Sequence, residues 1–230
     1  MKKEAWFFLI LFFFIGTSVY AQNTILSAGG GILSGASFYD EFYEIPGFAQ
    51  ISGFQIPTIR RETRSSEFNL GIFTFLDIKY VELNMAIYWG VISENYNWTD
   101  IFPETSSNFS GTSKHHRIYF DFGILAKYPF SFQRVNIFPL LGLQYTILFM
   151  EIWEDMVGII LDFALENLYL KFGGGIDYML NNRLFLRGNL LYRFSILNGH
   201  ERAILRNNPN STARFSAHGP QIRIGIGHKF

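Results

Sequence analysis

The sequence predicts an all-β protein, an eight-stranded antiparallel up-and-down transmembrane β-barrel, and three observations support this. Apolar and polar side chains alternate with a period of two over much of the 230 residues, as they do in strands whose two faces meet different surroundings. Short and long connections between these segments alternate along the chain. The composition combines 49% hydrophobic residues with 17% charged residues, no cysteine, and 19 basic against 19 acidic side chains. It excludes a disordered chain, a disulfide-stapled module and a nucleic-acid binder with a large basic excess.

The first 21 residues predict a signal peptide that is removed on export, which leaves residues 22–230 as one barrel domain. Lys2 and Lys3 precede an apolar run over residues 5–15, and Val19-Tyr20-Ala21 suits a cleavage site. A membrane-anchoring helix is the alternative, but it needs about 20 apolar residues, more than this run provides. No later run reaches 18 apolar residues, so we expect no transmembrane helix in the mature chain.

Eight segments carry the alternation. It is clearest over residues 80–90, where Val81, Leu83, Met85 and Ile87 share one face. The first segment is weaker, because three consecutive glycines blur its register. The expected strands cover residues 25–34, 68–77, 80–90, 118–127, 136–145, 168–178, 184–194 and 221–230.

The connections predict which end of the barrel faces outward. Short turns are expected around Asp77, around Pro129 and at Asn181-Asn182. Long loops are expected between them, over residues 35–66, 93–115, 146–167 and 198–217. Membrane barrels of bacteria have short periplasmic turns and longer extracellular loops.

Alternation alone also fits a soluble, lipocalin-like barrel with an apolar cavity, so the polar face decides the orientation. Eight strand glycines lie on that face and two on the apolar face. A solvated face gains nothing from glycine, whereas a narrow lumen needs small residues beside long ones. The polar face also carries charges that can pair across a lumen, as buried charges must. The predicted interior ion-pair network is Glu82, Asp121, Lys127, Lys171, Asp177, Arg187, Arg193 and Arg223.

The last strand carries a family resemblance. Its alternating residues resemble the β-signal that the bacterial barrel-assembly machinery recognises: Ile222, Ile224, Ile226, His228 and Phe230. From Thr24 onward the layout is similar to small eight-stranded barrels such as the OmpA transmembrane domain, OmpX and OmpW. His228 departs from that family, which more often has an apolar or aromatic residue there. The resemblance implies a place in the bacterial outer membrane, with outer-membrane lipid and the assembly machinery as partners.

No catalytic, cofactor-binding or metal site is expected. Two Gly-Gly-Gly runs lack the Gly-Lys-Ser/Thr of a phosphate-binding loop. His115 and His116 are adjacent on an expected strand end, point to opposite faces and lack a third ligand. Ser195, His200 and Glu201 supply the residue types of a lipid-modifying enzyme, but no motif spacing singles them out.

The leading functional hypothesis is a non-enzymatic outer-membrane barrel whose long loops serve envelope structure, surface interaction or adhesion, without a nucleic-acid partner. Six arginines of the first and last loops are candidate contacts to anionic groups of lipopolysaccharide or of a host surface ligand; solvated loop charge is the alternative. They are Arg60, Arg61, Arg64, Arg202, Arg206 and Arg214. An OmpW-like narrow channel or conduit for small hydrophobic molecules is the second hypothesis, because residues 153–165 are apolar and spaced for a short helix or a ligand entrance. A lipid-modifying enzyme is the third.

Overall fold

A computed structural model of the chain describes residues 26–47, 57–101, 106–153, 156–160, 166–198, 201, 204–206 and 210–230. Of residues 153, 156–160 and 166 it describes the backbone alone. The predicted signal peptide, residues 1–21, lies outside the described residues. Within them, no helix has the length and apolar character needed to cross a bilayer, a finding that concerns helices alone.

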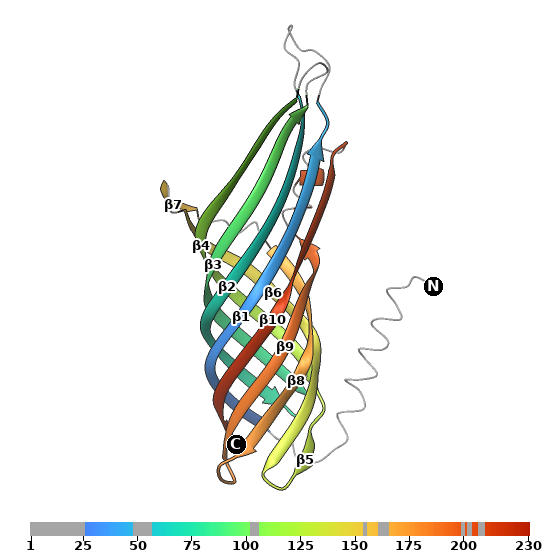
Figure 1. Cartoon of the computed structure of the whole chain (residues 1–230). Helices are drawn as coiled ribbons and strands as arrows, with labels where there is room; N and C mark the ends of the chain where they lie inside the picture. Colours follow the sequence, from blue (N-terminus) through green and yellow to red (C-terminus); the bar gives the residue numbers. More distant parts are fainter. Residues whose placement is uncertain are drawn as a thin grey trace, which may run out of the picture.

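Eight antiparallel strands form a closed ring in chain order, which confirms the predicted fold class (Figure 1). The last strand of the ring pairs with the first, so the sheet has no edge within the barrel. Two short strands, β5 (Phe130–Phe132) and β7 (Met156–Ile160), lie outside the ring and pair with β6. The ring strands are β1 (Leu26–Ile45), β2 (Thr58–Ile78), β3 (Val81–Ile101), β4 (Ser106–Lys127), β6 (Val135–Trp153), β8 (Glu166–Met179), β9 (Leu184–Asn198) and β10 (Thr212–Lys229).

The ring closes with a stagger of ten residues. From Ala28, successive pairings lead through every strand to His218, which pairs with Phe38, ten positions further along β1. A stagger of this size tilts the strands by about 40° and gives an eight-stranded barrel a lumen just wide enough for side chains. Figure 1 shows the tilt.

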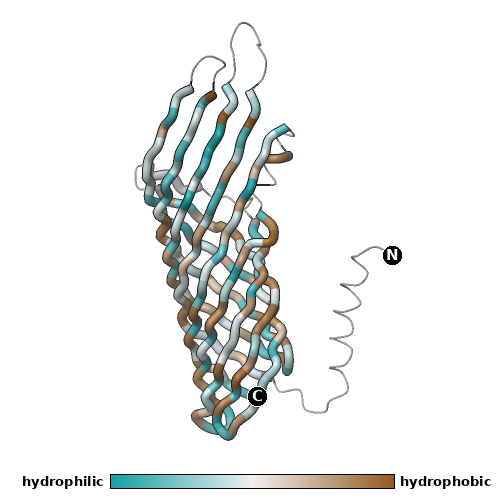
Figure 2. Tube along the Cα trace, turned by 45° about the vertical axis from the view of Figure 1, so that its right-hand side comes forward, coloured by the Kyte–Doolittle hydropathy of each residue, from teal (hydrophilic) through white to brown (hydrophobic). Residues whose placement is uncertain are grey.

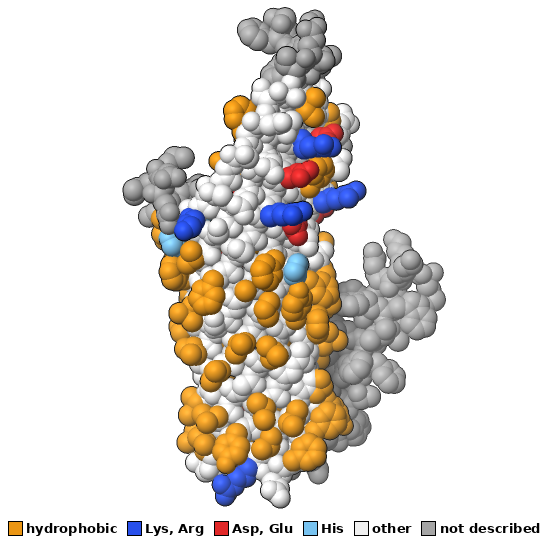
Figure 3. All heavy atoms as spheres, viewed as in Figure 1, with side chains coloured by type: hydrophobic (Ala, Val, Ile, Leu, Met, Phe, Trp, Pro, Cys, Tyr) orange, Lys and Arg blue, Asp and Glu red, His pale blue; other side chains and the backbone are white. Residues whose placement is uncertain are grey.

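The predicted apolar face lies on the outside. Val81, Leu83, Met85 and Ile87 are 36–49% exposed, and the same holds round the ring, which gives the apolar belt seen in Figure 3. On the tall side of the barrel this belt ends at Phe38, Phe68, Trp89 and Ile118. A soluble protein would not expose so large an apolar surface, and a ring without an edge satisfies its backbone in hydrocarbon. The chain is therefore a transmembrane β-barrel of the bacterial outer-membrane type, and the lipocalin-like alternative is wrong. Further members of the belt include Ile32, Leu70, Ile72, Phe122, Ile124, Leu141, Phe172, Ile176, Leu186, Leu190, Ile222, Ile224 and Ile226.

The expected loops are wrong in extent, because most of their residues continue the strands. Five strands rise beyond the belt as a sheet in the order β4-β3-β2-β1-β10, which we call the wall. Opposite it, β6, β8 and β9 stop near the upper edge of the belt (Figures 1 and 2). The third long connection contains the strand β7 in place of a helix, and its residues 161–165 lie outside the described part. The wall comprises residues 39–45, 58–66, 92–101, 106–117 and 212–217.

The wall is hard to recognise in the sequence because period-two alternation requires a clear difference between the surroundings of the two faces of a strand. The 21 residues of β2 extend for about 70 Å at the usual rise per residue. At the tilt above this is about 50 Å along the axis, roughly twice the height of a membrane barrel's apolar band, about 25 Å. Above the band neither face of the sheet meets lipid, so strand pairing continues while the alternation of hydropathy fades. Figure 2 shows this change in hydropathy along the strands.

The turn at Asn181-Asn182 lies where it is predicted, between β8 and β9, and the other two turns at the lower end are displaced. The first consists of Lys79 and Tyr80, because Ile78 still pairs with Val81; Lys79 takes the left-handed conformation with φ 55°. The second lies beyond β5, at Gln133 and Arg134, with φ 52° at Gln133. Asp77 is therefore a strand residue that points into the lumen.

The inward glycines make room for neighbouring strands and for long lumen side chains. A Cβ at Gly227 would lie 2.2 Å from the Phe185 ring, and a Cβ at Gly90 would lie 1.9 Å from the Glu67 carboxylate. The two glycines predicted to face outward differ, since a Cβ at Gly174 or Gly188 meets its nearest atom at 3.5 Å. Glycine therefore marks the crowded side of each strand.

We predict that Ile72→Lys, at a belt position 63% exposed, destabilises the barrel in lipid vesicles by about 2–4 kcal/mol, because the ammonium enters hydrocarbon. The control is Asn97→Lys, on the exposed outer face of the wall, which we expect to change the free energy of unfolding by less than about 0.5 kcal/mol. Urea titration of vesicle-inserted protein measures both. Equal costs at the two sites would contradict the position of the belt.

Candidate functional site in the lumen and the wall

The lower lumen contains a dense ion-pair cluster, which we call the lower cluster. Arg187 donates to both oxygens of Asp177 at 2.7 and 2.8 Å, to Asp77 at 2.7 Å and to Glu82 at 3.1 Å. Lys127 donates to Asp77 at 2.7 Å and lies 3.8 Å from Asp177. All five side chains are at most 7% exposed. Two cations thus join three carboxylates from five strands.

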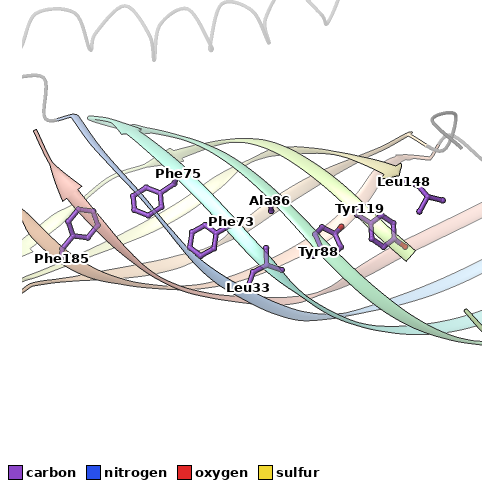
Figure 4. Close-up of a cluster of buried hydrophobic side chains, with 8 residues drawn as sticks. All are labelled: Leu33, Phe73, Phe75, Ala86, Tyr88, Tyr119, Leu148 and Phe185. Atoms are coloured by element: carbon purple, nitrogen blue, oxygen red, sulfur yellow. The ribbon is translucent and has the colours of Figure 1, made fainter. Parts of the chain in front are cut away.

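Aromatic rings close the lumen around this cluster. The Arg187 guanidinium lies 4.0 Å from the centre of the Phe75 ring, 5.1 Å from Phe185 and 5.3 Å from Phe138. Lys127 Nζ lies 4.3 Å from the centre of Phe138. Figure 4 shows Phe75 and Phe185 among the buried apolar side chains inside the barrel. The lower lumen is therefore filled by side chains.

The middle lumen does not have the close ion pairs that the sequence suggested. Asp121 accepts hydrogen bonds from Gln144 Nε2 and, at 2.7 Å, from Thr146 Oγ1, both neutral groups. Arg223 approaches a carboxylate only at 3.7 Å, from Nη1 to Glu82 Oε1. The predicted network residues are thus all buried, but only part of them is directly paired.

Two further cations of the middle lumen bond to neutral groups. Lys171 donates to Gln221 Oε1 at 2.7 Å. Arg193 donates to Tyr88 Oη at 3.0 Å and to Ser37 Oγ at 2.7 Å. Both cations are at most 2% exposed.

A tyrosine-lined carboxylate lies in the upper lumen. Glu67, 2% exposed, accepts hydrogen bonds from the hydroxyl groups of Tyr39 and Tyr119. Tyr119 stacks on Tyr88 with ring centres 4.9 Å apart, and both appear in Figure 4. Aromatic packing therefore continues up to the mouth of the barrel.

At the rim, above Ile118, the two adjacent histidines point to opposite faces as predicted. His115 is fully buried and its Nε2 lies 3.3 Å from Glu151 Oε1, which also accepts from Arg117 Nε at 2.8 Å. Burial, Arg117 and His116 lower the pKa of His115 to about 3, so its ring is neutral at pH 7. His116 stacks on Trp89 outside. Among the described residues, no three His, Cys, Asp or Glu side chains form a metal-binding group.

The candidate arginines of the first loop stand on β2 and already have acidic partners. Arg60 lies 3.0 Å from Glu44, Arg61 lies 2.7 Å from Glu94, and Arg64 lies 3.6 Å from Asp40. In Figure 3 most of the charged side chains on the visible face gather above the belt, and one basic side chain lies at its lower end. Of the other three arginines, Arg206 and Arg214 are exposed, and Arg202 lies outside the described residues.

Of the three residues that an enzyme would need, the structure describes Ser195 and Glu201 and shows a contact of each with a neighbouring residue. Ser195 Oγ donates to the Leu197 carbonyl at 3.2 Å, and the Glu201 backbone N–H donates to Asn198 Oδ1 at 2.9 Å. His200 lies outside the described residues. These contacts give neither Ser195 nor Glu201 a catalytic partner.

The terminal strand is placed as a lipid-facing strand. Ile222, Ile224 and Ile226 are 49–59% exposed, and His228 packs against Phe230 with ring centres 5.0 Å apart. The Phe230 N–H donates to the Leu26 carbonyl at 2.9 Å. A role of these residues as an assembly signal stays a prediction.

Sequence reasoning missed several lumen residues that bear on the site. Asp77 was assigned to a turn, although it shares the period-two face of Phe73 and Phe75. Glu67 falls between the expected first loop and the expected second strand, and the sequence does not predict the role of Gln221 as an acceptor. Asp77 and Glu67 both lie on the period-two face of Phe73 and Phe75 in β2. Extending that alternation beyond the apolar residues at each end of the expected strand would have identified both acids as inward-facing.

Comparisons with known proteins give likenesses of fold only. No protein-family model and no curated protein matches the chain. The outer membrane protein OprG from Pseudomonas aeruginosa is 14% identical, with 90% of this chain and 96% of that chain covered and a TM-score of 0.45. Neisserial surface protein A is 13% identical (88% and 99% covered, TM-score 0.38). The outer membrane protease OmpT from Escherichia coli is 8% identical (93% and 100% covered, TM-score 0.37). None of these likenesses assigns an activity to this chain.

We predict that Arg187→Met destabilises the barrel by about 3–5 kcal/mol, because it leaves three buried carboxylates with one lysine. Arg60→Met, which breaks an exposed pair, is expected to cost less than about 1 kcal/mol. Urea unfolding of both variants in the same vesicles gives the comparison. A small loss for Arg187→Met would show that the lower cluster does not hold the barrel together.

Proposed function

We propose that this protein is a non-enzymatic outer-membrane barrel that contacts other molecules at the cell surface and so serves adhesion or surface interaction. The wall is the observation that supports this most strongly. It holds polar, charged and aromatic side chains well above the belt, in a rigid sheet of five paired strands. Anchoring in the membrane does not require a sheet of this height.

The two faces of the wall offer different contacts. The outer face carries the exposed pairs Arg60–Glu44 and Arg64–Asp40. The inner face continues the lumen-facing positions and carries several aromatic side chains among polar and aliphatic ones. Its exposed members include Trp98 at 37% and Phe109 at 59%, and Arg61 lies 6.0 Å from the Tyr96 ring centre. Aromatic residues and arginine are the side chains that binding interfaces favour.

The charge balance of the wall favours short-range contacts over attraction to a polyanion. The wall has six acidic and six basic side chains, and four of its arginines are already paired with carboxylates. A balanced surface gives little long-range steering. A host glycan or protein bound through hydrogen bonds and aromatic contacts therefore suits the wall better than lipopolysaccharide phosphate does.

The wall also has a free strand edge. Above His115, β4 pairs with β3 and with no other described strand. Residues 106–113 of this edge contain neither proline nor a charged side chain, the features that usually protect exposed edges. A protein partner could add a strand here through backbone hydrogen bonds.

The conduit hypothesis is less well supported, because the lower cluster and its three phenylalanines fill the lumen. We predict that the purified protein gives no stable single-channel currents in planar bilayers. Arg187→Gly with Phe138→Ala removes two of the filling side chains and should produce them if the double variant folds. Steady currents from the unaltered protein would favour the conduit.

The surface-contact proposal is tested by shortening the wall in register. Residues 41–63 and 95–112 are each replaced by Asn-Gly, a dipeptide that forms tight hairpins, between the paired residues Asp40 and Arg64 and between Glu94 and Ser113. We expect cells displaying the shortened barrel to lose most of their binding to host-cell monolayers relative to cells displaying the full chain.

Heat-dependent migration on SDS gels is the control, since a folded barrel should shift on boiling with or without the wall. Shortening only residues 41–63 or only residues 95–112 separates the contributions of the two hairpins. Undiminished binding by a folded, fully shortened barrel would rule out the wall as the contact surface.

A further inference from the structure

Three buried cations meet in the middle lumen. Lys171, Arg193 and Arg223 come from β8, β9 and β10 and are at most 2% exposed. Lys171 and Arg193 are direct register partners on neighbouring strands and both point inward. Like charges directly opposite each other in an antiparallel pair are destabilising.

The third cation shares an acceptor with the first. Gln221 Oε1 accepts from Lys171 Nζ at 2.7 Å and from Arg223 Nε at 3.2 Å. Both donors therefore lie against one amide oxygen. A single neutral amide cannot offset two positive charges.

Few carboxylates lie close to the three cations of the middle lumen, whereas the cations of the lower cluster have close carboxylate partners. Among the described residues, no carboxylate lies within 4.0 Å of Lys171 or Arg193, and Arg223 has one contact, at 3.7 Å to Glu82. In the lower cluster, Arg187 alone makes carboxylate contacts at 2.7–3.2 Å to three residues. A buried charge without a close counter-charge costs several kcal/mol. The middle lumen, which we call the middle tier, therefore differs from the lower cluster in how its buried charge is offset.

Unused hydrogen-bonding atoms lie in the same tier. Arg223 Nη1, Gln221 Nε2 and Asn189 Nδ2 are buried donors without a hydrogen-bond partner in the described structure. Asn189 is the register partner of Arg223, and all three side chains are at most 3% exposed. Native proteins seldom leave buried donors unsatisfied. Unsatisfied amide donors therefore lie on the same strands as two of the cations, β9 and β10.

We propose that this tier binds a small inorganic anion of the chloride class, between Lys171, Arg193 and Arg223. The ammonium and the two guanidinium groups supply the charge, and the amide N–H groups of Gln221 and Asn189 supply further donors. The site lies below the mouth of the barrel, within the height of the belt, and is independent of the proposed surface contacts. The bound anion would stay in the lumen and offset the buried positive charge; it would not be transported through the barrel.

The test uses the full chain folded in detergent micelles in sodium chloride, sodium bromide or sodium gluconate at equal ionic strength. A ligand that binds only the folded state raises the unfolding temperature with its concentration. We expect chloride and bromide to raise it relative to gluconate, which is too large for the lumen. In Lys171→Met, the chloride concentration that gives half of this rise should increase about tenfold or more.

Lys127→Met is the matched control, because it removes a buried lysine from the lower cluster and should keep the anion effect. The site would be overturned if the unaltered protein showed no anion effect, or if Lys171→Met showed the full effect. Either result would indicate that water fills the middle tier. Should Lys171→Met fail to fold, crystals of the unaltered protein grown in bromide decide the matter. An anomalous peak among the three cations supports the site, and a map without one rejects it.

Discussion

Closure of the sheet on itself is the constraint from which the other features follow. Once β10 pairs with β1 at a stagger of ten residues, the tilt of the strands and the width of the lumen are set together. A lumen this narrow requires glycine wherever a ring or a long side chain crosses it, as at Gly227 beneath Phe185. The same closure removes every backbone edge from the hydrocarbon. Composition, glycine placement and buried charge are thus consequences of one geometry.

The part of the fold that touches lipid was readable from the sequence, because lipid imposes a pattern. Val81, Leu83, Met85 and Ile87 alternate with inward residues and lie outside as predicted. The wall imposes no such pattern, since neither of its faces meets lipid. Strand residues such as Arg60 and Glu94 consequently looked like loop residues, although their backbones continue the sheet.

The lumen was predictable in its composition but not in its partnerships. Period two assigned all eight charged residues to the inside, where they are buried. Two lumen side chains from different strands can pair only if they lie at the same height in the barrel. That height depends on the tilt and stagger of the strands, which the sequence does not show. Asp77 and Arg187 are 110 positions apart yet share two hydrogen bonds, whereas the predicted acid Asp121 bonds to Gln144 and Thr146. Register around the ring, unknown without coordinates, decides these contacts.

The unequal height of the barrel has a mechanical consequence. A tether attached at the top of the wall pulls at about 40° to β1–β4. The larger component of this force lies along the strands, so it shears their long ladders of backbone hydrogen bonds instead of unzipping them. The strands also lean with respect to the axis, which displaces the point of attachment sideways from the anchor. An outward pull at this offset point therefore exerts a torque that rocks the barrel within the bilayer, in addition to the force that acts to extract the protein.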